Sequence, residues 1–141
     1  MSDRKGIIGR YYENDLPVIL SFLNEWPDKA VRTKFPLLVV IAWKYEGSAH
    51  NGMPPREIND QLIALENALE EHFAQGNLSR HAYNRTGNNL KEFVYYCGSQ
   101  EIFLAELNQA LKEHNPYPID ITFYPDKDWT EFQRLLEDFK L

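Results

Sequence analysis

The order of apolar and polar residues along the chain predicts its secondary structure. Residues 37–45 (LLVVIAWKY) form a continuous apolar run, which is typical of a strand that is covered on both faces. Residues 55–75 instead predict a helix, because their apolar side chains recur every three or four positions and therefore share one helical face. These inward positions are Ile58, Leu62, Leu65, Leu69 and Phe73.

Shorter blocks predict the remaining strands and helices. We expect strands at 7–13, 17–24, 79–86, 90–97 and 119–124, and further helices at 99–114 and after Asp128. A helix over 17–24 is an alternative interpretation, but Pro17 and the β-branched pair behind it favour a strand. Residues 26–35 are expected to form a polar connection.

Two helix boundaries carry signals of their own. Asp128 is followed by Glu131 three residues later, which matches a capping box and predicts the start of the last helix. Gly76 can adopt a left-handed conformation and is expected to end the helix at 55–75.

The order of these elements predicts the fold. From residue 36 to residue 124 it is strand, helix, strand, strand, helix, strand, which is the split βαβ or ferredoxin-like sandwich. Right-handed crossovers then place the first and third strands in the middle, as antiparallel neighbours, and the second and fourth at the edges. Polarity agrees, because 37–45 and 90–97 are more apolar than 79–86 and 119–124. We therefore expect an α+β fold with an added N-terminal β-hairpin and an added C-terminal helix.

Composition narrows the class of protein. The 141 residues are 43% hydrophobic and 26% charged, which predicts one globular domain over residues 1–141 rather than a disordered chain. With 15 basic and 21 acidic residues the net charge is −6, which disfavours binding to nucleic acid or to an anionic membrane. The single cysteine and the absence of a signal-peptide pattern at the start favour a cytoplasmic location.

Candidate reactive groups are few. Cys97 precedes Gly98 and the start of a helix, a position that could activate a thiol, but no base follows at a recognised spacing. We therefore expect a buried thiol with a raised pKa. The four histidines show no metal-ligand spacing, so neither a metal nor another cofactor is expected. If the protein is an enzyme, the candidate reactive residues are Cys97, His81 and Asp126.

Two further groups are candidates for recognition. The loop Asn51-Gly52-Met53-Pro54 could offer backbone amides to an anion, although a turn that starts a helix is the favoured interpretation. Tyr95 and Tyr96 point to opposite faces of one strand, so one should pack under the two inner helices and the other under the added elements. Tyr96, Asp126 and Trp129 are recognition candidates, with Asp126 first a cap and Trp129 first a core anchor.

The same segments carry a family resemblance. Asn51–Pro54 leads into a helix with Glu66, the segment 92–96 follows a Thr86-Gly87 turn, and Asp126 and Trp129 open the last helix. Across nearly the whole chain this pattern resembles the bacterial domain of unknown function 695 family. The resemblance implies no established activity and no catalytic residue. It implies at most an association with the ferredoxin-like regulator of ribonuclease E.

These observations rank the possible functions. We expect a protein-interaction or regulatory module without catalysis, whose acidic surface would meet another protein with a basic surface and whose edge strands could pair with another sheet. The alternative is a small-ligand binder or enzyme with its site between the sheet and the added elements. Regulation of ribonuclease activity is a third possibility and rests on family association.

Overall fold

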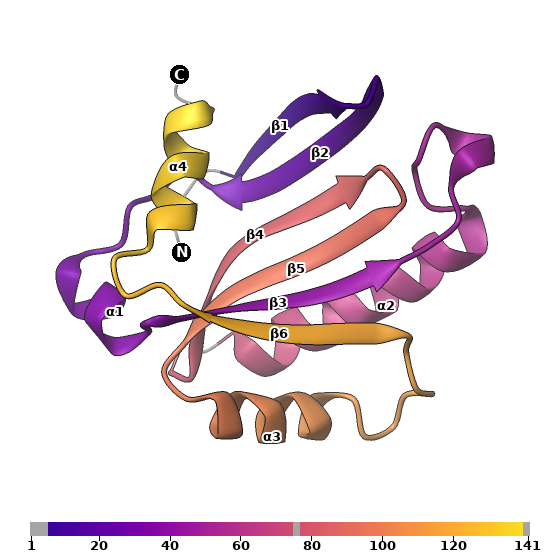
Figure 1. Cartoon of the computed structure of the whole chain (residues 1–141). Coiled ribbons are helices and arrows are strands. Elements are labelled where there is room, and N and C mark those ends of the chain that lie inside the picture. The colour runs from indigo at the N-terminus through magenta and orange to yellow at the C-terminus, as the bar shows by residue number, and fades with distance from the viewer. Residues whose placement is uncertain (1–5, 75–76, 140–141) are drawn as a thin grey trace.

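The computed structural model describes residues 6–74 and 77–139, and Figure 1 shows their arrangement. In chain order the elements are β1 (Gly6–Glu13), β2 (Leu16–Leu23), α1 (Lys29–Lys34), β3 (Leu37–Lys44), a short 3-10 helix η1 (Ser48–His50), α2 (Arg56–Phe73), β4 (Ser79–Gly87), β5 (Leu90–Cys97), α3 (Gln100–Ala110), β6 (Ile119–Pro125) and α4 (Thr130–Asp138). Every strand predicted from the sequence is present, and the rival helix over 17–24 is excluded because β2 occupies these residues.

The strands form one six-stranded sheet in the order β1-β2-β4-β5-β3-β6, in which all neighbours are antiparallel. As predicted, β3 and β5 are adjacent and antiparallel, with Val39 opposite Tyr95. The β4 and β6 strands flank this central pair. The fold is therefore α+β.

One prediction about the sheet is wrong. The strand at 79–86 was expected at an edge, but β2 pairs with its outer side, with Leu20 opposite Arg85. The free edges belong to β1 and β6. The polar residues of β4 misled the prediction, because Arg85 is buried and its charge is matched by Glu13 of β1 rather than by solvent.

Three local predictions also need correction. The connection at 26–35 contains helix α1, whose first turn is capped by the Asp28 carboxylate accepting from the Val31 amide. The last helix is capped by Asp126 instead of Asp128, because Trp129 adopts a left-handed conformation and α4 begins only at Thr130. The helices expected at 55–75 and 99–114 are shorter, and Gly76 lies outside the described residues.

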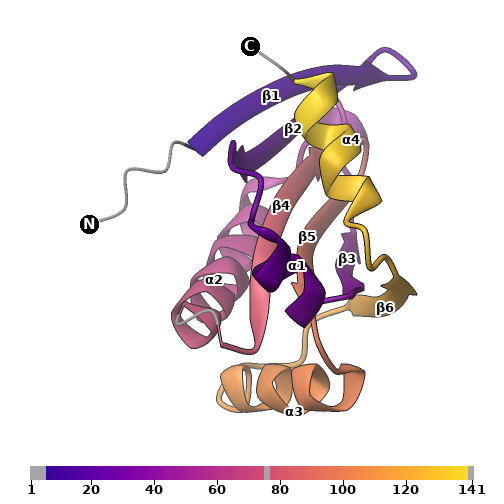
Figure 2. The same cartoon turned by 90° about the vertical axis from the view of Figure 1, so that its left-hand side faces the viewer.

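Helices cover both faces of the sheet. Figure 2 shows α2 on one side of the strands and α4 on the other. The four inward positions of α2 from Leu62 to Phe73 are buried as predicted, and with Phe103 and Leu107 of α3 they pack on Val39, Ile41 and Tyr95. Tyr96 faces the opposite way and packs with α1 and α4, which confirms the predicted split of the two tyrosines.

No helix within residues 6–74 and 77–139 has the length and apolar character needed to cross a membrane.

Candidate functional site

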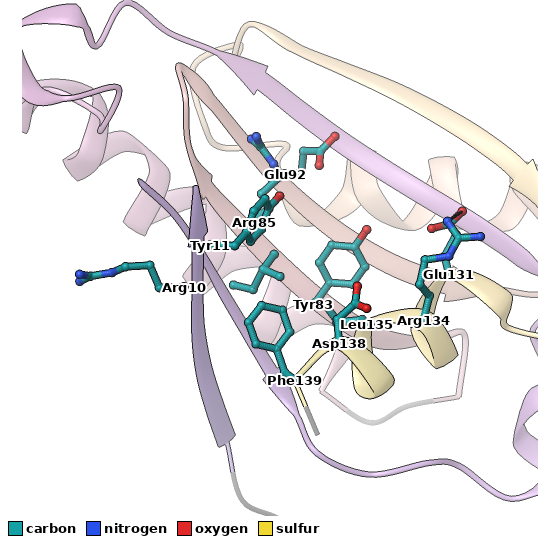
Figure 3. A pocket seen from close by; sticks show the side chains of 11 residues that line it. Arg10, Tyr11, Tyr83, Arg85, Glu92, Glu131, Arg134, Leu135, Asp138 and Phe139 are labelled. Carbon is teal, nitrogen blue, oxygen red and sulfur yellow. Dashed lines mark ion pairs between the residues drawn. The ribbon is translucent and has the colours of Figure 1, made fainter. Parts of the chain in front are cut away.

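A cavity of about 600 Å³ lies between α4 and the sheet face formed by β1, β2, β4 and β5. Its lining residues are Tyr11, Leu20, Tyr83, Arg85, Glu92, Glu131, Arg134, Leu135, Asp138 and Phe139, with Arg10 at its border. Figure 3 shows the α4 residues across from those of the sheet, and it shows Arg10 pointing away. This size is within the range of small-molecule sites.

Strand alternation brings the sheet residues of this cavity to one face. In the antiparallel register, Arg85 lies opposite Leu20 of β2 on one side and Glu92 of β5 on the other. Phe139, just after α4, closes the end next to β1. It can do so because Gly9 has no side chain: a Cβ atom there would lie 2.5 Å from the Phe139 ring.

Arg85 is a structural cation of this cavity. Its Nη1 donates to the carbonyl oxygens of Gly87 at 3.1 Å and Leu90 at 3.3 Å, and its Nη2 donates to Glu13 at 2.7 Å. A hydrogen bond donated by Asn88 lowers the pKa of the Glu13 carboxyl, so this carboxylate stays charged beside Arg85. The guanidinium therefore holds the β1–β2 hairpin onto the turn between β4 and β5.

Glu92 and Tyr83 differ from Arg85 in having no hydrogen-bond partner among the described residues. Both side chains are half-buried. Burial raises the pKa of the Glu92 carboxyl, and Arg85 opposes that rise only in part. Burial also raises the pKa of the Tyr83 hydroxyl, and the Glu92 charge adds to this effect. The cavity thus presents a carboxylate and a phenol that the fold itself does not use.

The raised pKa of Glu92 predicts a pH-dependent cost in stability. The groups that face it are Arg85 and Tyr83 of β4, Glu13 and Tyr11 of β1, and Glu131, Arg134 and Asp138 of α4. Because the folded state holds the Glu92 proton more tightly than the unfolded chain, this group makes stability fall as pH rises from the ordinary Glu pKa through the raised value. We expect Glu92→Gln to be more stable than the wild type at neutral pH and to lose that advantage below the ordinary Glu pKa.

Urea denaturation of both proteins across this pH range measures the difference. A variant that is less stable at neutral pH would show that Glu92 supports the fold instead of straining it.

The three candidate reactive residues are not brought together. His81 lines a second cavity of about 610 Å³ near α1 and the end of α2, Cys97 lies in the core under α2 and α3, and Asp126 caps α4 on the opposite face. No hydrogen bond or ion pair between described residues joins any two of them. His81 Nε2 donates to Asn84 Oδ1 at 2.8 Å, and burial lowers the pKa of its ring.

Cys97 is fully buried, as expected from the sequence, and burial raises the pKa of its thiol to about 11. We therefore expect a thiol-reactive probe to label it slowly in native buffer at neutral pH, because little thiolate forms and the sulfur is not accessible. The same probe should react quickly in urea, which provides the matched control. Fast labelling of the folded protein would contradict this environment.

Tyr96, Asp126 and Trp129 do come together, as an internal cluster. The Tyr96 hydroxyl donates to Asp126 Oδ2 at 2.7 Å, and the Trp129 ring stacks on the Tyr96 ring with a centroid distance of 3.8 Å. Trp129 Nε1 donates to the carbonyl oxygen of Phe35 at 2.9 Å. Tyr96 and Trp129 are both 0% exposed, so their contacts hold α4 on the sheet.

The loop Asn51–Pro54 is also internally bonded. The Gly52 amide donates to Gly47 at 2.8 Å and the Met53 amide donates to His50 at 3.0 Å. Pro54 has no amide hydrogen. The Gly52 carbonyl accepts from Tyr45 at 2.6 Å, which fastens the loop to the end of β3. These bonds support the interpretation of a turn, since the amides of Gly52 and Met53 are already used.

The lining residues Tyr11, Tyr83 and Arg85 were not predicted as site residues, and Glu92 entered only through the family resemblance. One sequence signal could have indicated them. Arg85 and Glu92 lie in predicted strands, in which successive side chains point to opposite faces of the sheet. A charge on a covered face costs free energy unless it is paired, so a charged residue there indicates a structural or binding role. Which face is covered depends on α4 and the hairpin, and this is not visible in the local pattern.

Among residues 6–74 and 77–139, no group of three or more His, Cys, Asp or Glu side chains is placed to hold a metal ion.

The fold and the site define an α+β domain with an antiparallel sheet and a charged, aromatic-lined cavity beneath its last helix. A family model matches residues 11–136, and the chain belongs to the family of unknown function DUF695. The match confirms the family resemblance and spans all lining residues except Arg10, Asp138 and Phe139. No curated protein and no solved structure matches the chain significantly.

Proposed function

We propose that the protein is a ligand-binding module whose ligand occupies the cavity beneath α4. One observation carries this proposal: the cavity contains a half-buried carboxylate, Glu92, and a half-buried phenol, Tyr83, which have no partner among the described residues. Polar groups that are partly withdrawn from water and have no protein partner cost free energy, and a ligand that forms hydrogen bonds with them would reduce that cost.

The position of the cavity supports the same proposal. We propose that β3, α2, β4, β5, α3 and β6 form a ferredoxin-like unit, a proposal supported by the inner position of β3 and β5 and by antiparallel pairing throughout. The cavity lies on the face of this unit opposite α2 and α3, and the hairpin and α4 complete it. A cavity between the sheet and the added elements is what the alternative function, a small-ligand binder or enzyme, would require, and this supports the proposal.

The expectation of an interaction module is compatible with this cavity. A partner protein could insert one side chain where a free small molecule would bind. Both uses require the same cavity to accept a ligand, so one experiment tests them together.

Nuclear magnetic resonance with a fragment library tests the proposal. Backbone amide signals of the uniformly labelled protein are recorded with each fragment. We expect binding fragments to shift the amides of Tyr83, Glu92 and Leu135. In Leu20→Trp, where a larger ring fills the floor of the cavity, these shifts should disappear. Fragments that bind only elsewhere, or a library without any binder, would contradict the proposal.

A further inference from the structure

We infer that the ligand of this cavity carries a protonated nitrogen, in an alkylammonium or guanidinium group, that binds the Glu92 carboxylate. The inference rests on the proposed function and names the chemical class of its ligand.

The first argument is that the two cations directed into the cavity, Arg85 and Arg134, already have acidic partners. Arg85 makes three hydrogen bonds, one of them to the Glu13 carboxylate. Arg134 lies 3.6 Å from Glu131, one turn along α4. Arg10 points away from the cavity (Figure 3). Of the three lining cations, the two directed into the cavity therefore have acidic partners and the third points out of it, so an anionic ligand would find no free cation among these lining residues.

The second argument is that two carboxylates of the cavity lining have no cationic partner among the described residues. Glu92 and Asp138 line the cavity, and neither forms an ion pair with another described residue. Glu92 is the more buried of the two, and burial raises its pKa. A positively charged N–H donor next to Glu92 would supply a hydrogen bond and a matching charge, neither of which another described residue supplies. Such charge-assisted hydrogen bonds are stronger than neutral ones.

The third argument is that the remaining lining residues are aromatic or apolar. Aromatic rings of Tyr11, Tyr83 and Phe139 line the cavity, and ring faces attract organic cations. Leu20 and Leu135 offer apolar surface to the carbon chain that carries the charged group. Carboxylate, rings and apolar surface together fit a cation on an aliphatic or aromatic stem better than a neutral or anionic molecule.

Two sources could present this chemistry, namely a free amine or a Lys or Arg side chain of a partner protein. Binding is measured by the same amide shifts with matched probes. Benzylamine and butylguanidine represent free cations, and benzyl alcohol and butylurea are their neutral counterparts. Doubly capped lysine and arginine amides represent a side chain within a protein.

We expect each cationic probe to bind at least about tenfold more tightly than its neutral counterpart, which corresponds to about 1.4 kcal/mol. Tighter binding of the capped amino acids would assign the site to a partner's side chain, and tighter binding of the free amines would assign it to a small molecule. Both results support a cationic ligand.

Variants assign the effect to one carboxylate. Glu92→Gln should weaken the cationic probes at least about tenfold and leave the neutral ones unchanged. Glu137→Gln is the matched control, because it removes the same charge from an exposed position of α4 outside the cavity lining, and it should leave all affinities unchanged. Amide spectra with native dispersion show that each variant is folded.

Two outcomes would overturn the inference. If neutral probes bind as tightly as cationic ones, or if Glu92→Gln keeps the full affinity for cations, the ligand is not a cation, while shifts at the cavity residues would still support a ligand-binding module. If no probe and no library fragment shifts any cavity residue, the proposed function itself fails.

Discussion

Replacing Trp129 with alanine is expected to lower the free energy of unfolding by about 3–5 kcal/mol, the usual cost of deleting a large buried aromatic side chain. Trp129 is 0% exposed and stacks on Tyr96 at a centroid distance of 3.8 Å. Its indole nitrogen donates to the carbonyl oxygen of Phe35, so the substitution also leaves a buried acceptor without its donor. Urea denaturation followed by circular dichroism measures the loss.

Trp26 provides the matched control. It is 40% exposed, and although its ring stacks with Phe132, the centroids are 6.4 Å apart. Trp26→Ala should therefore cost about 1 kcal/mol, the typical value for an average substitution. Similar losses for the two variants would contradict the role of Trp129 in holding α4 onto the sheet.

Leu65→Ala should lower the free energy of unfolding by about 2–5 kcal/mol, because truncation in the centre of the core leaves a cavity that the neighbours fill only in part. Leu65 is 0% exposed, in the middle of the buried face of α2. Ile63 lies two positions away and is 48% exposed, so Ile63→Ala should change stability by only about 0.5 kcal/mol. Equal midpoints in urea would mean that α2 is turned differently on the sheet.

The arrangement of the inner strands could be predicted because burial determines which residue types occur within each single strand or helix. The run at 37–45 is apolar at nearly every position because α2 covers one face of β3, while Phe35, Trp129 and α4 cover part of the other. The face of α2 was equally visible, since Leu62, Leu65 and Leu69 repeat with the helical period and are all buried. In both cases the signal lies within a single element.

The wrong predictions concern features that depend on contacts between residues far apart in the sequence. Arg85 gives β4 a polar pattern, but its partner Glu13 lies 72 residues earlier, so the sequence around β4 could not reveal that the strand is internal. The start of α4 was misplaced for a similar reason. Asp128 matches a capping box by spacing, but Trp129 is drawn into the core and takes a left-handed backbone, and Asp126 then becomes the cap.

The cavity could not be predicted for the same physical reason. Its residues come from four strands and from the last helix, and each is ordinary within its own element. Glu92 is notable only because α4 covers the sheet nearby and because no side chain within residues 6–74 and 77–139 pairs with it. A candidate site of this kind is a property of the assembled layers rather than of a motif.

The contact between Gly9 and Phe139 has a thermodynamic consequence. It brings the first strand and the end of the last helix together without a covalent link, directly at the rim of the cavity. A molecule that fills the cavity would bridge these two elements, so its binding energy would also oppose their separation. Amide hydrogens of β1 and α4 should then slow more on ligand binding than those of α3, on the far face, which slow only through the gain in global stability.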